Sequence, residues 1–156
     1  MSQYSPKSAL PKVENMRVAI VRTEWNESIT EPMAVEAQNL FISQGFDADD
    51  VATFVVPGAV ELTFAASQLI ETSLYDAIIV IGCVIRGDTP HFDYVCQSVT
   101  QGITALNADC DIPVIFGVLT VNNEQQAIER VEAGKGREFA ETAIKMHAFA
   151  QYAKSL

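Results

Sequence analysis

The polar turn from Arg86 to His91 holds the side chains best suited to chemistry in this chain. It follows directly on an apolar stretch that ends at Ile85. In an open parallel sheet, the carboxyl end of a strand and the start of the next helix face one crevice, so backbone N–H groups near Asp88 and Thr89 would be free to hold an anion. A histidine beside an anion is a candidate general acid or base, although a helix-capping histidine fits the spacing equally well. We therefore expect the active site to centre on this turn.

Further turns of the strand-to-helix type carry residues suited to ligand binding. Trp25, the only tryptophan, stands in a polar loop beside Asn26. Its indole is suited to stacking on a flat heterocycle, and a packing role fits the sequence as well. Gly58 precedes a predicted helix and lets a ligand approach the backbone closely, but an ordinary turn with Glu61 matched to the helix dipole is also compatible. A last turn of this type is expected at 120–122.

Two basic residues late in the chain are placed to reach an anion from a neighbouring strand end. They are Arg130 and Lys135. Both side chains bind phosphate well, yet solvated surface charge is the more frequent role of such residues. His147, the second histidine, lies among apolar residues of a predicted helix, and we interpret it as structural.

Four apolar runs predict the strands that position these turns. Each run is apolar over most of its length, which suits strands that helices cover on both faces. The predicted strands span 17–23, 51–56, 77–85 and 113–119. Apolar residues between them recur at helical spacing, first in Met33, Ala37, Leu40 and Phe41. This alternation predicts an α/β fold: a single-domain three-layer sandwich, with a four-stranded parallel sheet in flavodoxin-like order and helices on both faces.

The end of the chain is predicted to hold two helices. Asn122 or Asn123 is placed to cap a short helix that reaches about Val131. Gly134 and Gly136 are expected to end that helix before a last helix begins. A sheet of only four strands leaves edges that a neighbouring chain often covers. We therefore expect a homo-oligomer.

Composition excludes several classes of protein. The length of 156 residues fits one domain at 16–156, preceded by an arm at 1–15. A formal net charge of −10 argues against nucleic-acid binding but leaves room for a small anionic substrate. The three cysteines form no C-x-x-C pair, and no segment has the pattern of a signal peptide or a membrane span, so we expect a cytoplasmic protein with no membrane contact. With only two histidines and no metal-binding motif, no metal site is expected.

Three segments carry a resemblance to a known family. They are VPGAVE at 56–61, GCVIRGDTPHFDYVC at 82–96, and IPVIFGVLT at 112–120 followed by QAIER at 126–130. Together they closely resemble the lumazine synthase family, and the likeness runs from about residue 17 to the final helix. The resemblance implies condensation of 5-amino-6-(D-ribitylamino)uracil with 3,4-dihydroxy-2-butanone 4-phosphate. The products would be 6,7-dimethyl-8-ribityllumazine, phosphate and water, in the penultimate step of riboflavin biosynthesis.

The resemblance also implies a role for each matching residue. His91 would transfer protons, and Arg130 would hold the phosphate together with the backbone of Asp88 and Thr89. The pyrimidine and ribityl groups would be bound by Trp25, Asn26, Ala59, Val60, Glu61, Cys83, Val84, Ile85, Phe116 and Lys135. Trp25 would stack on the pyrimidine, and Phe116 would come from an adjacent subunit. No cofactor is implied, and the implied partners are the small-molecule substrates, other copies of the chain in a pentamer or an icosahedral shell, and riboflavin synthase.

Two features depart from the family pattern. Val60 stands where a larger side chain is common, and the link at 130–138 looks shorter than usual. Because this link influences shell assembly in the family, we favour a pentamer. Two other classes of protein are alternatives to an enzyme. One is a non-catalytic flavin- or lumazine-binding relative, against which the presence of both His91 and Arg130 argues. The other is a flavodoxin- or receiver-like signalling module, which would need a phosphate-binding loop or an acidic cluster after the first strand.

Overall fold

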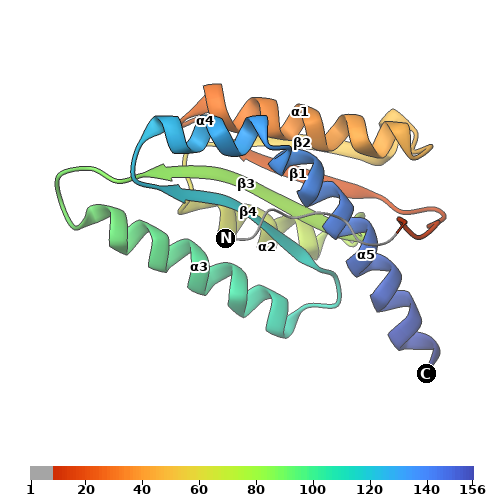
Figure 1. Ribbon diagram of the computed structural model, residues 1–156. Helices are drawn as coiled ribbons and strands as arrows, with labels where there is room; N and C mark the ends of the chain where they lie inside the picture. The colour runs from red at the N-terminus through yellow and green to blue at the C-terminus, as the bar shows by residue number, and fades with distance from the viewer. Residues whose placement is uncertain (1–8) are drawn as a thin grey trace.

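Strands and helices alternate along the chain, as the sequence predicts. The computed structural model describes residues 9–156 (Figure 1). The elements are β1 (Val18–Thr23), α1 (Glu27–Ser43), the 3₁₀ helix η1 (Ala48–Asp50), β2 (Val51–Val56), α2 (Glu61–Glu71), β3 (Ala77–Ile85), α3 (His91–Asp109), β4 (Val114–Val121), α4 (Glu124–Glu132) and α5 (Lys135–Ser155). Residues 1–8 of the predicted arm lie outside the described residues. In the remainder of that arm, Leu10 and Val13 pack against the buried core.

The four strands form one parallel sheet in the order β2-β1-β3-β4. In β1, Val18 pairs with Val51 of β2 on one side and with Ala77 of β3 on the other. Along the chain, β2 is therefore added on one side of β1, and β3 and β4 are then added on the other side. A crevice forms outside the carboxyl ends of the two central strands at such a reversal, and this is where ligands bind in open α/β sheets.

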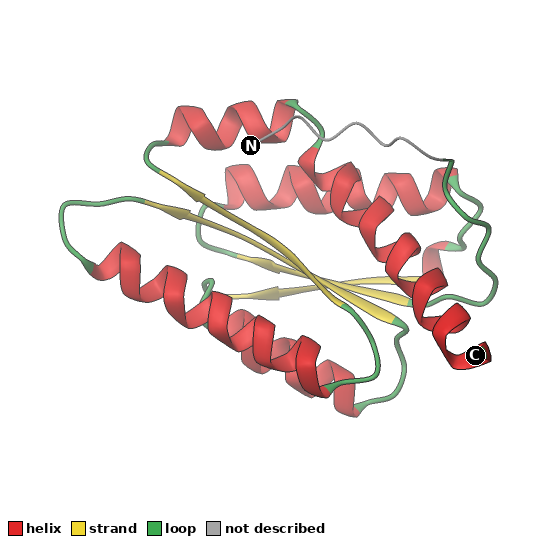
Figure 2. Cartoon of the chain, turned by 60° about the horizontal axis from the view of Figure 1, so that its bottom comes forward, coloured by secondary structure: helices red, strands yellow, loops and turns green. Residues whose placement is uncertain are grey.

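Helices cover both faces of the sheet and give the predicted three layers. Helices α1, α4 and α5 lie on one side, and α2 and α3 lie on the other (Figures 1 and 2). Side chains along β1 alternate between two buried clusters: Val18 and Ile20 face α1, whereas Ala19 and Val21 face α2 and α3. Because both faces of the central strands β1 and β3 are buried, these strands contain apolar runs without the polar alternation of a half-exposed sheet, whereas the edge strand β2 is exposed over its middle residues.

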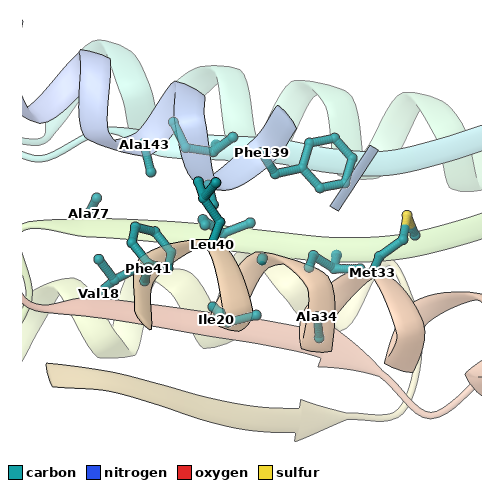
Figure 3. Close-up of a cluster of buried hydrophobic side chains, with 14 of the residues drawn as sticks. Val18, Ile20, Met33, Ala34, Leu40, Phe41, Ala77, Phe139 and Ala143 are labelled. Atoms are coloured by element: carbon teal, nitrogen blue, oxygen red, sulfur yellow. The ribbon is translucent and has the colours of Figure 1, made fainter. Parts of the chain in front are cut away.

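The larger buried cluster joins the sheet to α1 and α5. Met33 and Phe41 of α1 are fully buried there, and Phe139 of α5 belongs to the same cluster (Figure 3). The helical spacing of apolar residues predicted this face of α1. Burying side chains of this size stabilises the fold by about 1.5–3 kcal/mol each.

The prediction that Gly136 interrupts the helical structure is wrong. Helix α4 ends at Glu132, and Gly134 alone turns the chain, with a φ of 89°. Gly136 lies inside α5 and is buried against the backbone of Met33, so that a Cβ atom there would overlap the carbonyl of that residue. This glycine therefore allows α5 to approach α1 closely rather than ending a helix.

Candidate active site

A cavity of about 530 Å³ lies at the carboxyl ends of β1 and β3, and we call it the histidine cavity. Loops after three strands and the start of α3 contribute its walls. Most of the predicted site residues line it, namely Trp25, Asn26, Ala59, Val60, Glu61, Cys83, Val84, Ile85, Thr89 and His91. Three further residues line this cavity, and the sequence analysis assigned them no role in the site: Thr23, Phe92 and Val95.

The loop after β1 is held through its backbone, and the indole of Trp25 is exposed. The N–H of Trp25 donates to the carbonyl of Pro57 at 3.0 Å, and its carbonyl accepts from the hydroxyl of Thr23 at 2.8 Å. The side-chain amide of Asn26 donates to the carbonyl of Cys83 at 2.7 Å. Trp25 itself is 75% exposed, so its ring is held in place at one end and offers a flat face to a ligand.

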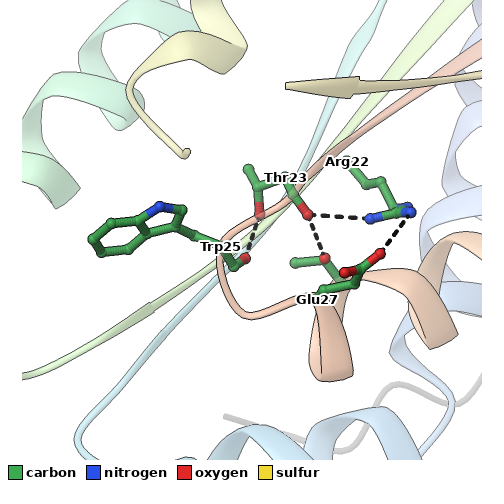
Figure 4. A network of polar contacts seen from close by, with 5 residues as sticks. Arg22, Thr23, Trp25 and Glu27 are labelled. Carbon is green, nitrogen blue, oxygen red and sulfur yellow. Dashed lines mark hydrogen bonds and ion pairs between the residues drawn. The ribbon is translucent and has the colours of Figure 1, made fainter. Parts of the chain in front are cut away.

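Thr23 organises this loop, a role that the sequence analysis did not predict. It is buried, and its carbonyl accepts hydrogen bonds from the hydroxyl of Thr30 at 2.7 Å and from Arg22 at 3.4 Å. Arg22 also forms an ion pair with Glu27 at 3.2 Å, and the indole of Trp25 points away from this network (Figure 4). A hydroxyl residue at the end of a buried strand is the one signal that would have found Thr23.

The turn after β2 leads directly into α2. The N–H of Glu61 donates to the carbonyl of Gly58 at 3.1 Å, and Ala59 accepts in the same way from Leu62. The carboxylate of Glu61 lies beside the Cα of Gly58, which brings an acceptor to the cavity wall. A carboxylate in the first turn of a helix is also favoured by the helix dipole.

The phosphate turn, as we call residues 86–91, ends at the first residue of α3, His91. The N–H of His91 donates to the hydroxyl of Thr89 at 3.4 Å. Within the described part of the chain, no hydrogen bond occupies the backbone N–H of Gly87, Asp88 or Thr89. These donors at a helix start are available to an anion. Asp88, a predicted phosphate-binding residue, does not line the cavity, whereas Gly87 and Thr89 on either side of it do.

Cys83 contributes a buried apolar wall. Its side chain is 5% exposed, and burial, assisted by the negative charge of Glu124, raises the pKa of the thiol to about 11. The thiol therefore stays protonated near neutral pH. A protonated thiol is a poor nucleophile, so this cysteine shapes the cavity rather than attacking a substrate.

The remaining predicted residues lie in a different place. Phe116, Arg130 and Lys135 line a second cavity of about 560 Å³ over the edge strand β4, which we call the arginine cavity. Arg130 donates to the carbonyl of Gln126 at 3.0 Å, and Lys135 pairs with Glu138 at 2.9 Å. One chain therefore does not bring all predicted site residues together: it carries them as two separate groups.

The described residues contain no group of three or more histidine, cysteine or acidic side chains placed to hold a metal ion. No helix in the same part of the chain is long and apolar enough to cross a membrane.

Comparison with known proteins identifies a matching family and several relatives. Residues 15–151 match the family described as 6,7-dimethyl-8-ribityllumazine synthase. A relative of that name from Porphyromonas gingivalis is 49% identical over 149 residues, which cover 94% of this chain and 92% of the relative. One from Bacteroides fragilis is 50% identical over 137 residues, covering 86% and 96%. A third, from Flavobacterium johnsoniae, is 46% identical over 156 residues, covering 98% and 82%.

Proposed function

Because the chain belongs to the 6,7-dimethyl-8-ribityllumazine synthase family, we propose that it joins 5-amino-6-(D-ribitylamino)uracil to 3,4-dihydroxy-2-butanone 4-phosphate. This transferase reaction releases 6,7-dimethyl-8-ribityllumazine, phosphate and water, and it precedes the last step of riboflavin biosynthesis. The family match over residues 15–151 is the observation that carries this conclusion. Riboflavin synthase, which would consume the product, is a candidate partner. We assign the reaction to the cytoplasm, since Cys83, Cys96 and Cys110 are all free thiols.

The histidine cavity supplies the groups that would bind both substrates. The exposed indole of Trp25 stacks on the pyrimidine, and Asn26 and Glu61 offer polar contacts at its edge. The free N–H groups of the phosphate turn hold the phosphate of the second substrate. His91 stands at the end of that turn and lines the same cavity, where it would lie between the bound phosphate and the pyrimidine.

The reaction needs proton transfers and alignment. The 5-amino group attacks the ketone carbonyl, and loss of water from the resulting carbinolamine gives a Schiff base. Elimination of phosphate leaves an enol at the adjacent hydroxyl-bearing carbon, and this enol tautomerises to a new carbonyl. Attack by the ribitylamino nitrogen on that carbonyl, with loss of a second water, then closes the second ring. His91 accepts and returns protons in these steps. Holding the two reactants in line supplies more of the acceleration than a single acid or base does.

The arginine cavity would complete the site of a neighbouring protomer. Phe116 is 39% exposed on edge strand β4, and Arg130 and Lys135 open onto the same cavity. Large apolar side chains are also exposed on the helices beside the histidine cavity: Phe64 of α2 and Tyr94 of α3. Two different surfaces that complement each other form a head-to-tail interface, which closes into a ring when the rotation permits. We therefore propose a homo-oligomer built on a pentamer, with every site at a seam between two chains.

A direct assay tests the reaction. The purified chain is mixed with both substrates, and the lumazine product is followed by its fluorescence. Formation of product at a rate that depends on both substrates supports the proposal, and no product above the uncatalysed background contradicts it. Sedimentation velocity on the same sample separates a monomer from a pentamer and a pentamer from a shell.

A mixing experiment tests the shared site. His91→Ala and Arg130→Ala chains are each of low activity alone and are unfolded and refolded together in equal amounts. If sites form between chains, about one quarter of the sites in the mixed oligomer regain both intact residues, and activity rises well above the sum of the separate variants. Activity equal to that sum would place both residues in one chain's own site and exclude the seam.

A further inference from the structure

Arg86 is the first residue of the phosphate turn, and its guanidinium contacts three neighbouring side chains. Its Nε donates to the side-chain oxygen of Asn122 at 3.0 Å. Its Nη1 lies 3.7 Å from the carboxylate of Asp93, and the guanidinium carbon lies 4.5 Å from the ring centre of Phe92. Its backbone N–H donates to the carbonyl of Val121 at 2.9 Å.

These contacts tie the two ends of the phosphate turn together and to a second loop. Phe92 and Asp93 lie in the first turn of α3, so Arg86 bridges the start and the end of the turn. Asn122 follows β4, whose connection to α4 runs beside this turn beyond the end of the sheet (Figure 1). Between these anchors, Gly87, Asp88 and Thr89 have no hydrogen bond of their own through their N–H groups in the described part of the chain. Arg86 therefore restrains both ends of the segment that carries these donors.

The same hydrogen bonds lead on toward Arg130. The backbone N–H of Asn122 donates to the side-chain oxygen of Gln126 at 2.7 Å, and the carbonyl of Gln126 accepts from Arg130 at 3.0 Å. Asn123 caps α4 through the N–H of Gln126 at 2.9 Å. The two phosphate-binding elements of one chain are thus joined by a continuous series of side-chain contacts that starts at Arg86.

We propose that Arg86 is a positioning residue, which holds the phosphate turn in its anion-binding conformation and does not itself ligate the phosphate. The inference rests on the proposed function. Arg86 lines neither the histidine cavity nor the arginine cavity, and its donors face Asn122 and Asp93. An N–H cradle binds an anion best when its geometry is fixed before the anion arrives. Loss of Arg86 therefore weakens binding of the phosphorylated substrate and leaves binding of the uracil unchanged.

The test compares Arg86→Ala, Arg86→Lys, Asn122→Ala and the double variant Arg86→Ala with Asn122→Ala. Steady-state KM is measured for each substrate, and inorganic phosphate is titrated by calorimetry. We expect Arg86→Ala to raise the KM of the ketose phosphate and the Kd of inorganic phosphate about tenfold, a loss typical of one charge-assisted hydrogen bond. Asn122→Ala should shift both constants in the same direction without changing any charge. The double variant should match Arg86→Ala, because the two residues act through one contact. The Arg86→Lys variant should be as impaired as Asn122→Ala, because lysine lacks the planar fork.

Other outcomes would overturn the proposal. If Asn122→Ala binds phosphate as wild type does and Arg86→Lys restores full affinity, Arg86 acts on the phosphate by its charge alone. If KM rises equally for both substrates and the thermal unfolding midpoint falls, the role is structural. Arg17→Ala removes a surface arginine paired with Asp50 at the amino end of β1 and controls for net charge. If the wild type forms no lumazine, the proposed function fails, whereas the phosphate titration still decides whether Arg86 holds the turn.

Discussion

The histidine cavity and the arginine cavity differ in what holds their functional groups. In the histidine cavity, hydrogen bonds between loops fix the backbone, and among the described residues no hydrogen bond occupies the indole of Trp25 or the N–H groups of Gly87, Asp88 and Thr89. In the arginine cavity, the charged groups are already paired within the chain, Lys135 with Glu138 and Arg130 with a carbonyl of its own helix. The first cavity is a preformed site with open donors. The second presents oriented cations, which suits a surface that completes another chain's site.

Removing the proton-transfer group from the histidine cavity gives the largest expected loss of rate. We expect His91→Ala to lower kcat by roughly 10²-fold and by no more than about 10⁴-fold, the range of general acid–base catalysis. Activity should not vanish, because alignment of the two substrates remains. Stopped-flow or steady-state measurement of lumazine formation checks this. The matched control is His147→Asn, which alters the other histidine, buried in α5. Wild-type kcat in His91→Ala would remove this residue from the mechanism.

Removing the cation from the arginine cavity should change affinity for one substrate only. We expect Arg130→Ala to raise the KM of the ketose phosphate by about 10–100-fold, since hydrogen bonds to charged groups contribute about 1.5–3 kcal/mol. The KM of the uracil should stay within twofold, on the order of normal error in such constants. Arg130→Lys, which retains the charge, should recover part of the loss. Equal losses for both substrates would show that the arginine cavity does not act on the phosphate.

Removing the indole from the histidine cavity should have a smaller effect, and it should act on the KM of the uracil instead of the KM of the ketose phosphate. Trp25→Ala should raise the KM of the uracil about tenfold, because an aromatic pair contributes up to about 1.5 kcal/mol beyond the area that it buries. The KM of the ketose phosphate should not change. Trp25→Phe keeps a flat ring and should lie near wild type. If the two variants are equally impaired, the indole makes a specific polar contact and stacking is not its role.

The two cavities also differ in how well the sequence predicted them. Every loop of the histidine cavity follows a strand, so the apolar runs that predicted the strands also predicted which residues meet at their carboxyl ends. In the arginine cavity, Arg130 and Lys135 were singled out as basic residues and Phe116 was named from the family resemblance, but their distance from His91 within one chain depends on tertiary packing that no local pattern reveals. Gly136 illustrates the difficulty. A glycine in a sequence indicates either a break or a close approach, and only its contact with Met33 decides between them. The contact between Arg86 and Asn122 spans 36 positions in the sequence and leaves no local pattern.

Burial of the Cys83 thiol in the wall of the histidine cavity predicts that the free energy of unfolding depends on pH. This is the smallest of the expected effects under neutral conditions. Burial raises the pKa of the Cys83 thiol from 9.0 to about 11, so the folded chain holds this proton more tightly than the unfolded chain does. The contribution to stability is therefore complete below pH 9 and is lost as the pH rises from 9 to about 11. Two pKa units correspond to on the order of 2–3 kcal/mol.

Cys83→Ala removes this titration and provides the reference. The free energy of unfolding in urea is measured for both chains at pH 8, 9.5 and about 10.5, where linkage predicts the change. The difference in stability between wild type and Cys83→Ala should become less favourable to the wild type as the pH rises, while other titrating groups affect both chains alike. A difference that stays constant over this range would mean that water reaches the thiol in the folded chain. The wall of the histidine cavity would then be hydrated rather than dry.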